Sequence, residues 1–148
     1  MTTVQPLRVV HLDAIHHAEI IDLWQRAGLH IRPDGRDSLD AFARQMATGV
    51  QTPIGLRDGQ RLVAVVLATH DSRKGWINRL AVDPDYRRQG LALRLIGLCE
   101  EHFQAQGVDI WAALIEDWNE ASLALFRQAG YALAPDVTYA SRRSHEDV

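Results

Sequence analysis

The sequence predicts an α+β fold in which a central mixed, mostly antiparallel sheet is flanked by about four helices. Two observations lead to this prediction. Helical patterns of apolar residues alternate with short apolar runs along the chain, and three of these runs follow one another across short turns. Because tight turns join antiparallel strands, most of the sheet is expected to be antiparallel. The predicted order is strand, helix, helix, three strands, helix, strand, helix and two strands.

One strand and two amphipathic helices begin the chain. The strand is expected over residues 7–12, and Asp13 is a suitable N-cap for a helix that ends at Gly28. Ser38 stands where it would cap the second helix. Apolar residues at helical spacing support both helices: Ile20, Leu23, Trp24, Ala27, Leu39, Phe42, Ala43 and Met46.

Three consecutive strands form the middle of the chain. Residues 53–56 and 61–70 are joined by Asp58-Gly59, which suits a tight turn because both positions tolerate positive φ. The second of these runs is apolar enough to be a buried central strand. The third strand, over 76–82, ends at Asp83-Pro84, because proline cannot donate a hydrogen bond to a sheet.

The second half of the chain is expected to add two helices and three strands. Glycine stands where each helix would end, at Gly107 and Gly130. Because no repeat or Pro/Gly linker interrupts the sequence, residues 1–148 are expected to form a single domain with a flexible tail over 144–148. The elements are a helix over 91–106, a strand over 108–115, a helix that Asn119 caps and that extends through Ala129, and closing strands over 131–133 and 137–142.

The composition is that of a soluble globular protein. Hydrophobic residues make up 47% and charged residues 24% of the 148 residues, which excludes a disordered or collagen-like chain. A net charge of −3 lacks the basic balance of a nucleic-acid-binding protein, so no nucleic-acid partner is expected. No signal-sequence pattern opens the chain, and the longest apolar run, 62–68, is too short to span a bilayer. We therefore expect a cytoplasmic protein without a membrane partner.

Neither a disulfide nor a metal site is expected. Cys99 is the only cysteine, so the chain has no intramolecular disulfide and no cysteine zinc cluster. His16 and His17 are adjacent, and without the i, i+4 spacing they point in different directions on a helix. We predict no metal.

The segment between the third of these strands and the long helix has the features of an anion site. The first turn of a helix leaves backbone N–H groups unpaired, and Gly90 and Ala92 leave room for a phosphate to reach them. Arg87 and Arg88 add positive charge. The alternative is that Gly90 only begins a helix and that the arginines form a solvated face. The chain has no P-loop and no Gly-x-Gly-x-x-Gly motif.

Two motifs carry a resemblance to a known family. Arg87-x-x-Gly90-x-Ala92 matches the pattern Gln/Arg-x-x-Gly-x-Gly/Ala, and it follows a strand that ends in Leu80-Ala81-Val82-Asp83-Pro84. Asn119, Ala121, Leu125 and Gly130-Tyr131 fit a second motif further along the chain. With both motifs in this order, the chain resembles the GNAT superfamily of N-acetyltransferases, in its small single-domain bacterial form, and the resemblance implies a GNAT-like fold.

The resemblance implies that acetyl-CoA is the acetyl donor. The backbone of residues 80–82 would pair with the pantetheine arm, and the pyrophosphate would rest on the loop that begins at Arg87. Asn119 would bind the cofactor arm through its side-chain amide, and a simple N-cap role is the alternative. The implied cofactor-binding residues are Leu80, Ala81, Val82, Arg87, Arg88, Gln89, Gly90, Leu91, Ala92, Asn119 and Phe126.

The sequence departs from the family in its acid and base. A tyrosine in this family often protonates the departing thiolate, but Phe126 stands at that position and cannot donate a proton. Leu114 stands where a catalytic glutamate occurs in some members. Glu116 lies two residues further on, hence on the same face of a strand, and is the candidate general base acting through a water. The alternative for Glu116 is an exposed carboxylate at a strand end.

The acceptor is expected between the first two helices and their loop, as in the family. Trp24 and His30 are the candidate substrate contacts, although the helical spacing of Trp24 also suits a core residue. The resemblance implies a primary amine of a small molecule or a peptide as the acceptor, and a monomer or homodimer. Because Phe126 and Leu114 replace the usual acid and base, the alternative is a non-catalytic acyl-CoA-binding sensor or partner-binding module.

Overall fold

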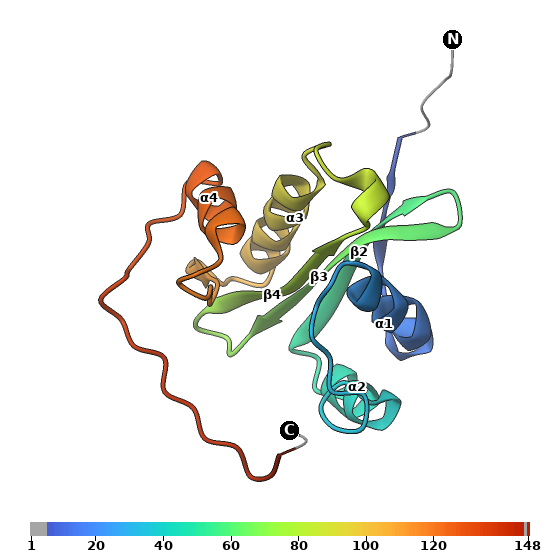
Figure 1. Cartoon of the computed structure of the whole chain (residues 1–148), viewed down its shortest axis with the longest axis horizontal. Helices are drawn as coiled ribbons and strands as arrows, with labels where there is room; N and C mark the ends of the chain where they lie inside the picture. Colours follow the sequence, from blue (N-terminus) through green and yellow to red (C-terminus); the bar gives the residue numbers. More distant parts are fainter. Residues whose placement is uncertain (1–5, 147) are drawn as a thin grey trace.

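A five-stranded sheet forms the centre of the molecule (Figure 1). The computed structural model describes residues 6–146 and 148. The strands are β1 (Arg8–His11), β2 (Gln51–Asp58), β3 (Arg61–His70), β4 (Gly75–Val82) and β5 (Trp111–Ala112). They lie in the order β1-β2-β3-β4-β5, and neighbours are antiparallel except for β4 and β5, which are parallel. The mixed, mostly antiparallel sheet is confirmed.

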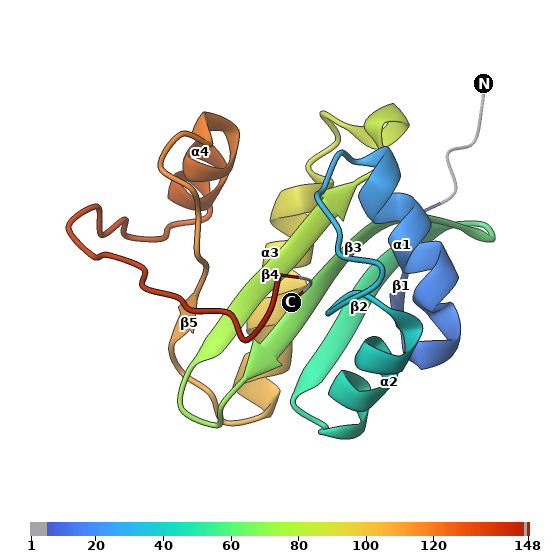
Figure 2. The same cartoon turned by 60° about the horizontal axis from the view of Figure 1, so that its bottom comes forward.

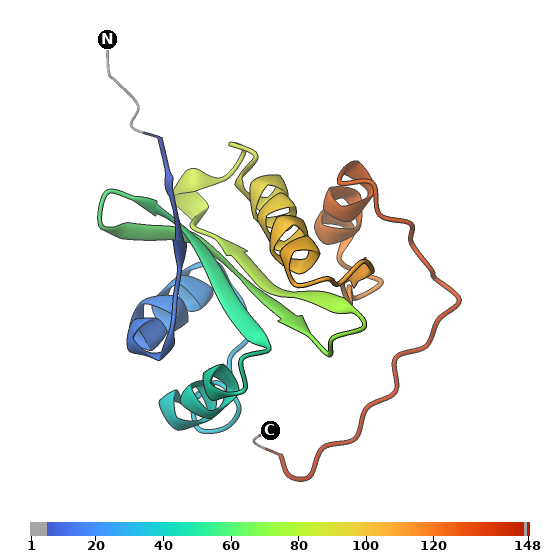
Figure 3. The same ribbon diagram turned by 180° about the vertical axis from the view of Figure 1, so that it is seen from behind.

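Helices cover both faces of this sheet, as the sequence predicts. On one face lie α1 (His17–Arg26) and α2 (Leu39–Ala47), and on the other α3 (Leu91–Ala105) and α4 (Glu120–Gln128) (Figures 1 and 3). Single turns of 3-10 helix, η1 (Ala14–His16) and η2 (Pro84–Tyr86), stand shortly before α1 and α3. Ser38 and Asn119 each accept a backbone N–H at the start of the helix that the sequence expects them to cap. Asp13 instead caps η1, which directly precedes α1, and the N-cap position of α1 is His16.

The central strand β3 is buried on both faces. Val66 and Ala68 belong to the apolar cluster beneath α3, whereas Val65 and Leu67 belong to the cluster beneath α1. A strand covered on both sides has a nearly continuous apolar sequence, which is the pattern that predicted it.

A bulge interrupts β4 before its last three residues. The pairing register with β3 shifts between Val65 and Leu67, so that Arg79 and Leu80 lie opposite a single residue of β3. Arg79 takes a left-handed backbone conformation with a φ of 54°. Bulges bend a strand and leave backbone groups unpaired.

The strands β4 and β5 pair only where both begin. Gly75 and Trp76 are the β4 residues that pair with β5. In the part of the chain that the structure describes, no strand pairs with the remaining length of β4, up to Val82, on this side. The end of β4 therefore has a free edge with backbone groups available to a ligand.

Two strand predictions for the second half of the chain are wrong. The strand expected over 108–115 is limited to β5, and residues 131–146 contain no strand, so the closing pair of strands predicted over 131–133 and 137–142 is absent. Beyond α4 the chain instead forms an exposed arm (Figure 2). A two-residue β5 offers too short an edge for a further strand, and the apolar Val137 and Tyr139 of the arm remain 71% and 69% exposed.

The expected flexible tail over 144–148 includes Asp147, which lies outside the described residues. Across the residues that the structure covers, no helix is both long enough and apolar enough to cross a membrane.

Candidate functional site

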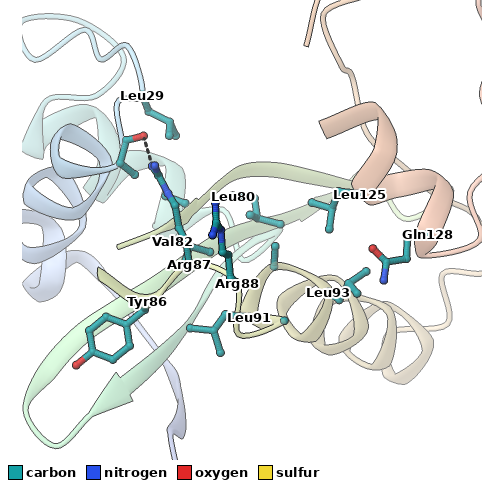
Figure 4. Close-up of a pocket in the computed structure, with 14 residues that line it drawn as sticks. Leu29, Leu80, Val82, Tyr86, Arg87, Arg88, Leu91, Leu93, Leu125 and Gln128 are labelled. Atoms are coloured by element: carbon teal, nitrogen blue, oxygen red, sulfur yellow. Dashed lines mark hydrogen bonds between the residues drawn. The ribbon is translucent and has the colours of Figure 1, made fainter. Parts of the chain in front are cut away.

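A cleft of about 500 Å3 opens where β4 ends and α3 begins (Figure 4). From the opposite side α4 contributes side chains, and the residues that follow α1 close one end. The free edge of β4 therefore borders this cleft. Its lining consists of Ala27, Leu29, Leu80, Ala81, Val82, Tyr86, Arg87, Arg88, Gly90, Leu91, Ala92, Leu93, Leu125 and Gln128.

The N-terminus of α3 faces the cleft without a side-chain cap. Gly90 occupies the N-cap position with a φ of 74°, and no side chain accepts its first backbone N–H groups. A Cβ atom at Gly90 would meet no heavy atom within 4 Å, so the space above these amides is open. Unpaired amides together with the helix dipole favour a bound anion such as a phosphate.

Two arginines give the lining its charge. Arg87 and Arg88 are the charged residues among the described lining residues, and both are exposed. One guanidinium N–H of Arg87 donates to the carbonyl oxygen of Ala27 at 3.5 Å, which connects the loop to the end of α1 (Figure 4). The remaining guanidinium donors suit a phosphate, which accepts charged hydrogen bonds.

The carboxylate of Asp83 anchors the loop that follows β4. It is 1% exposed and forms ion pairs with Arg26 of α1 and Arg61 of β3. Burial alone would raise the pKa of Asp83, but the Asp85 N–H and the two guanidinium groups outweigh this effect and lower it. The start of the anion loop is thereby held against both α1 and the sheet.

Tyr86 is a lining residue that the sequence analysis missed. Its hydroxyl donates to the Asp58 carboxylate at 2.5 Å, and Arg61 lies 5.8 Å from the ring centroid. The hydrogen bond to Asp58, with a smaller contribution from burial, raises the pKa of Tyr86. Tyr86 lies within the same strand-loop-helix segment as the predicted anion site, and this position could have identified it as a lining residue. Because the hydroxyl proton is committed to Asp58, Tyr86 is a poor proton donor for a ligand in the cleft.

Most of the residues predicted from the first motif line the cleft. They are Leu80, Ala81, Val82, Arg87, Arg88, Gly90, Leu91 and Ala92, whereas Gln89 is exposed outside the lining. Short sequence separation explains this outcome, since these residues form one continuous turn of chain around the α3 N-terminus.

The two residues predicted from the second motif lie elsewhere. Phe126 is 6% exposed and packs edge-on against Tyr131, with ring centroids 5.1 Å apart. From α4 it is Leu125 and Gln128 that face the cleft (Figure 4). Asn119 accepts the Ser122 N–H at 3.1 Å, which is the N-cap alternative.

Glu116 is exposed in the turn between β5 and α4 and does not line the cleft. Because β5 ends at Ala112, the strand alternation that placed Glu116 beside Leu114 does not extend to these residues. Its backbone carbonyl accepts the Asn119 N–H at 3.0 Å, so the residue serves in the turn before α4.

The two candidate substrate contacts differ in accessibility. Trp24 is 2% exposed and belongs to the core beneath α1, so its ring is closed to an acceptor in this structure. His30 is exposed on the loop between α1 and α2. Within the described residues no three His, Cys, Asp or Glu side chains are grouped to hold a metal ion.

Comparison with known proteins identifies a family. The model of the acetyltransferase (GNAT) family matches residues 17–131. A curated acetyltransferase of Sodalis glossinidius (strain morsitans) is 26% identical over 129 residues, which cover 87% of this chain and 89% of that protein.

Solved structures share the fold. A predicted acetyltransferase with acetyl-CoA from Clostridium acetobutylicum superposes with a TM-score of 0.74 at 11% identity, covering 92% of this chain and 96% of that one. For a ribosomal-protein-alanine N-acetyltransferase from Brucella melitensis biovar Abortus 2308 the TM-score is 0.72 at 16% identity, with 94% and 100% covered. An aminoglycoside acetyltransferase from an uncultured soil metagenomic sample, in complex with sisomicin, gives 0.76 at 13% identity, with 94% and 97% covered. With a family model that matches most of its length, this chain belongs to the acetyltransferase (GNAT) family.

Proposed function

We propose that this protein is an acetyl-CoA-dependent N-acetyltransferase, formed by a single domain over residues 1–148, that acetylates a primary amine of a small molecule or a peptide. The observation that carries the proposal is the uncapped N-terminus of α3 beside Arg87 and Arg88, at the free edge of β4. Structural neighbours with acetyl-CoA or coenzyme A bound support the choice of donor.

The cleft suits two adjoining parts of acetyl-CoA, the pyrophosphate and the pantetheine arm. The pyrophosphate is expected at the α3 amides, beside Arg87 and Arg88, where positive charge and N–H donors border the same cleft. The pantetheine arm is expected to pair with the free edge of β4 over residues 80–82, as an added strand would. The lining then supplies both a polar and an apolar part for one extended ligand.

The chemistry relies on positioning. The neutral amine attacks the thioester carbonyl, and the backbone N–H near Val82 is the expected donor to the developing oxyanion. An amine with a free pKa of about 10.4 first gives a proton to solvent water, and the nitrogen gives a second proton to water as the C–N bond forms. The C–S bond then breaks to release a thiolate, whose pKa of about 8.5 lets it leave without a general acid. Holding the amine beside the thioester supplies much of the rate without a strong acid or base.

Calorimetric titration of acetyl-CoA into the protein tests the cofactor site. Gly90→Asp places a carboxylate among the phosphate-binding amides and should raise the Kd roughly 100-fold, because like charges in contact cost several kcal/mol. Gly107→Asp is the matched control, since Gly107 has a φ of 75°, equally open space, and lies at the other end of α3. Equal Kd values for the two variants would overturn the assignment of the site.

An array of amines, polyamines, amino acids and peptides tests the reaction. Release of free thiol from acetyl-CoA, followed by mass spectrometry of the acceptor, should identify an acetylated amine. Cys99 should not interfere, because it is buried and burial raises the pKa of its thiol to about 12.

One observation favours a second function, the binding of acyl-CoA without turnover. Among the described residues that line the cleft there is no carboxylate and no imidazole, and Phe126 is packed in the core. A sensor of acyl-CoA would bind the ligand at the same site. Tight binding combined with silence across the whole amine array would favour this second function.

A further inference from the structure

Arg79 stands in the β4 bulge with a backbone conformation that ordinarily favours glycine. Its φ of 54° lies in the left-handed region, which residues with a Cβ adopt at a cost in free energy. In bulges with this backbone the left-handed position is usually glycine. An arginine there calls for a reason in its side-chain contacts.

The Arg79 side chain reaches from β4 to the loop between α1 and α2, residues 27–38. One Nη atom donates to the carbonyl oxygen of His30 at 2.8 Å, and the other donates to the Asp37 carboxylate at 2.8 Å. The guanidinium also lies 4.5 Å from the centre of the Trp24 ring. A rigid, planar guanidinium can make both hydrogen bonds and the stacking contact at once, which a lysine cannot.

Asp37, the loop residue that accepts the Arg79 hydrogen bond, also makes contacts to the rest of the loop and to α1. Its buried carboxylate also accepts the Arg32 N–H at 2.7 Å, and its backbone carbonyl lies 2.8 Å from Nε2 of His17. Among the described residues, Arg79 is the cation that pairs with this carboxylate. Removing Arg79 therefore leaves a buried carboxylate without its counter-charge, which loosens the loop.

The same contact joins two walls of the cleft. Leu80, the next residue along β4, lines the cleft, and the 27–38 loop contributes Ala27 and Leu29 to it. The strand that borders the proposed thioester site and the loop on the opposite side are thus connected through one side chain.

We propose that Arg79 is a positioning residue for the amine acceptor, which fixes the 27–38 loop relative to the strand that binds the thioester. The inference rests on the proposed function, because it takes the loop to be the wall against which the amine is held. A misplacement of about 1 Å between reacting groups is enough to lower the rate roughly 100-fold. Within the described residues the Arg79 side chain hydrogen-bonds to the 27–38 loop and not to the α3 amides or to residues 80–82, so acetyl-CoA binding is expected to change far less than the position of the amine.

Two variants and one control test this role. Arg79→Gly suits the left-handed backbone and keeps the bulge, whereas Arg79→Lys keeps the charge but loses the forked donor. Arg57→Met is the control, since Arg57 forms a two-pronged ion pair with Glu19, at 2.7 and 3.1 Å, away from the cleft lining.

The measurements are kcat and KM for the amine, the Kd of acetyl-CoA, and hydrogen-deuterium exchange of residues 29–37. Arg79→Gly should lower kcat/KM for the amine roughly 100-fold, leave the Kd of acetyl-CoA within about twofold, and speed amide exchange in the loop. Arg79→Lys should fall between Arg79→Gly and the unmodified protein. Arg57→Met should lower the Tm and leave amine kinetics and loop exchange unchanged.

Three outcomes overturn the inference: amine kinetics of Arg79→Gly equal to those of the unmodified protein, unchanged exchange in the loop, or equal losses in acetyl-CoA binding and amine kinetics. The last of these would mean a general structural role. If the unmodified protein acetylates no amine in the array, the proposed function fails. If it acetylates one and Arg79→Gly matches it, only the role of Arg79 fails.

Discussion

At the end of β4, the buried carboxylate of Asp83 joins the guanidinium groups of two other elements, Arg26 and Arg61. Its pKa is lowered in the folded protein, so it contributes stability that is fully present above the unfolded pKa, near 3.8, and is lost as pH falls through the folded value. Asp83→Asn should lower the free energy of unfolding at neutral pH by about 1–3 kcal/mol, because both arginines lose the buried carboxylate and keep only the exposed ones, Asp22 and Asp85.

Urea unfolding of Asp83→Asn and of the unmodified protein at pH 7 and near pH 3 measures this contribution. The difference between the two proteins should shrink at the lower pH, because below about 3.8 the Asp83 carboxyl of the unfolded chain binds a proton, which stabilises the unfolded state relative to the folded protein with its lowered pKa. A difference that stays constant would show that the ion pairs contribute nothing beyond the hydrogen bonds of the neutral side chain.

Phe126→Tyr is expected to give no faster turnover. The ring is buried against Tyr131, away from the cleft lining, so an added hydroxyl has no route to a thiol in the cleft. If it finds no hydrogen-bond partner, the buried hydroxyl should lower the free energy of unfolding by about 1–3 kcal/mol. Rapid-quench measurement of thiol release below pH 8.5, paired with urea unfolding, checks both expectations, and a several-fold faster release would contradict the packing described for α4.

Residues of one continuous segment were predictable from the sequence, and residues brought from another element were not. The turn from Leu80 to Ala92 is local, and its motif predicts which residues border the cleft. Which residues of α4 face the cleft depends on tertiary packing: Phe126 joins the core cluster, and Leu125 and Gln128 line the cleft in its place. The Arg79 contacts span 42 and 49 residues of sequence, and no local pattern announces them.

At the scale of elements, β4 and α3 meet closely at Gly75. A Cβ atom there would come within 2.7 Å of the Phe103 ring, which is fully buried and cannot withdraw. Gly75→Ala should therefore lower the free energy of unfolding by about 1–3 kcal/mol, as overpacked core substitutions do.

Gly97→Ala provides the opposite control within α3. A Cβ atom at Gly97 meets nothing within 4 Å, and alanine is preferred over glycine inside a helix by about 1 kcal/mol. Chemical unfolding should therefore shift in opposite directions for the two variants. A neutral Gly75→Ala would mean that the sheet and α3 separate easily at this point.

The ends of helices were predictable from the sequence, because neighbouring residues determine them. The lengths of several strands were not, because they depend on pairing with another strand. Side-chain caps depend on neighbours in sequence, and Ser38 and Asn119 stand where predicted. The tight turn lies one residue later than predicted: Asp58 still pairs with Arg61, so the turn is Gly59-Gln60 and not Asp58-Gly59. Strand length depends on an available partner. The expected run over 108–115 has β4 beside it only at its centre, and residues 131–142 have no adjacent strand at all within the described chain.

Over the whole molecule, the cleft is bordered by elements from both sides of the sheet: the chain after α1 on one side, and α3 with α4 on the other. A ligand that bridges them should oppose their separation and stabilise the fold as a unit. At a free concentration of 100 times Kd, acetyl-CoA adds about 2.7 kcal/mol to the free energy of unfolding, which for a chain of this size raises Tm by roughly 5–10 °C.

Thermal unfolding with and without acetyl-CoA measures this effect, and the paired glycine variants locate its origin. Gly107→Asp should show the full rise in Tm, whereas Gly90→Asp should show almost none at the same ligand concentration. Added salt should reduce the rise for the unmodified protein, because the exposed Arg87 and Arg88 attract the pyrophosphate through solvent that salt screens. An equal rise in both variants would mean that the ligand binds away from the α3 N-terminus, since a carboxylate among those amides repels a phosphate whatever else the cleft provides.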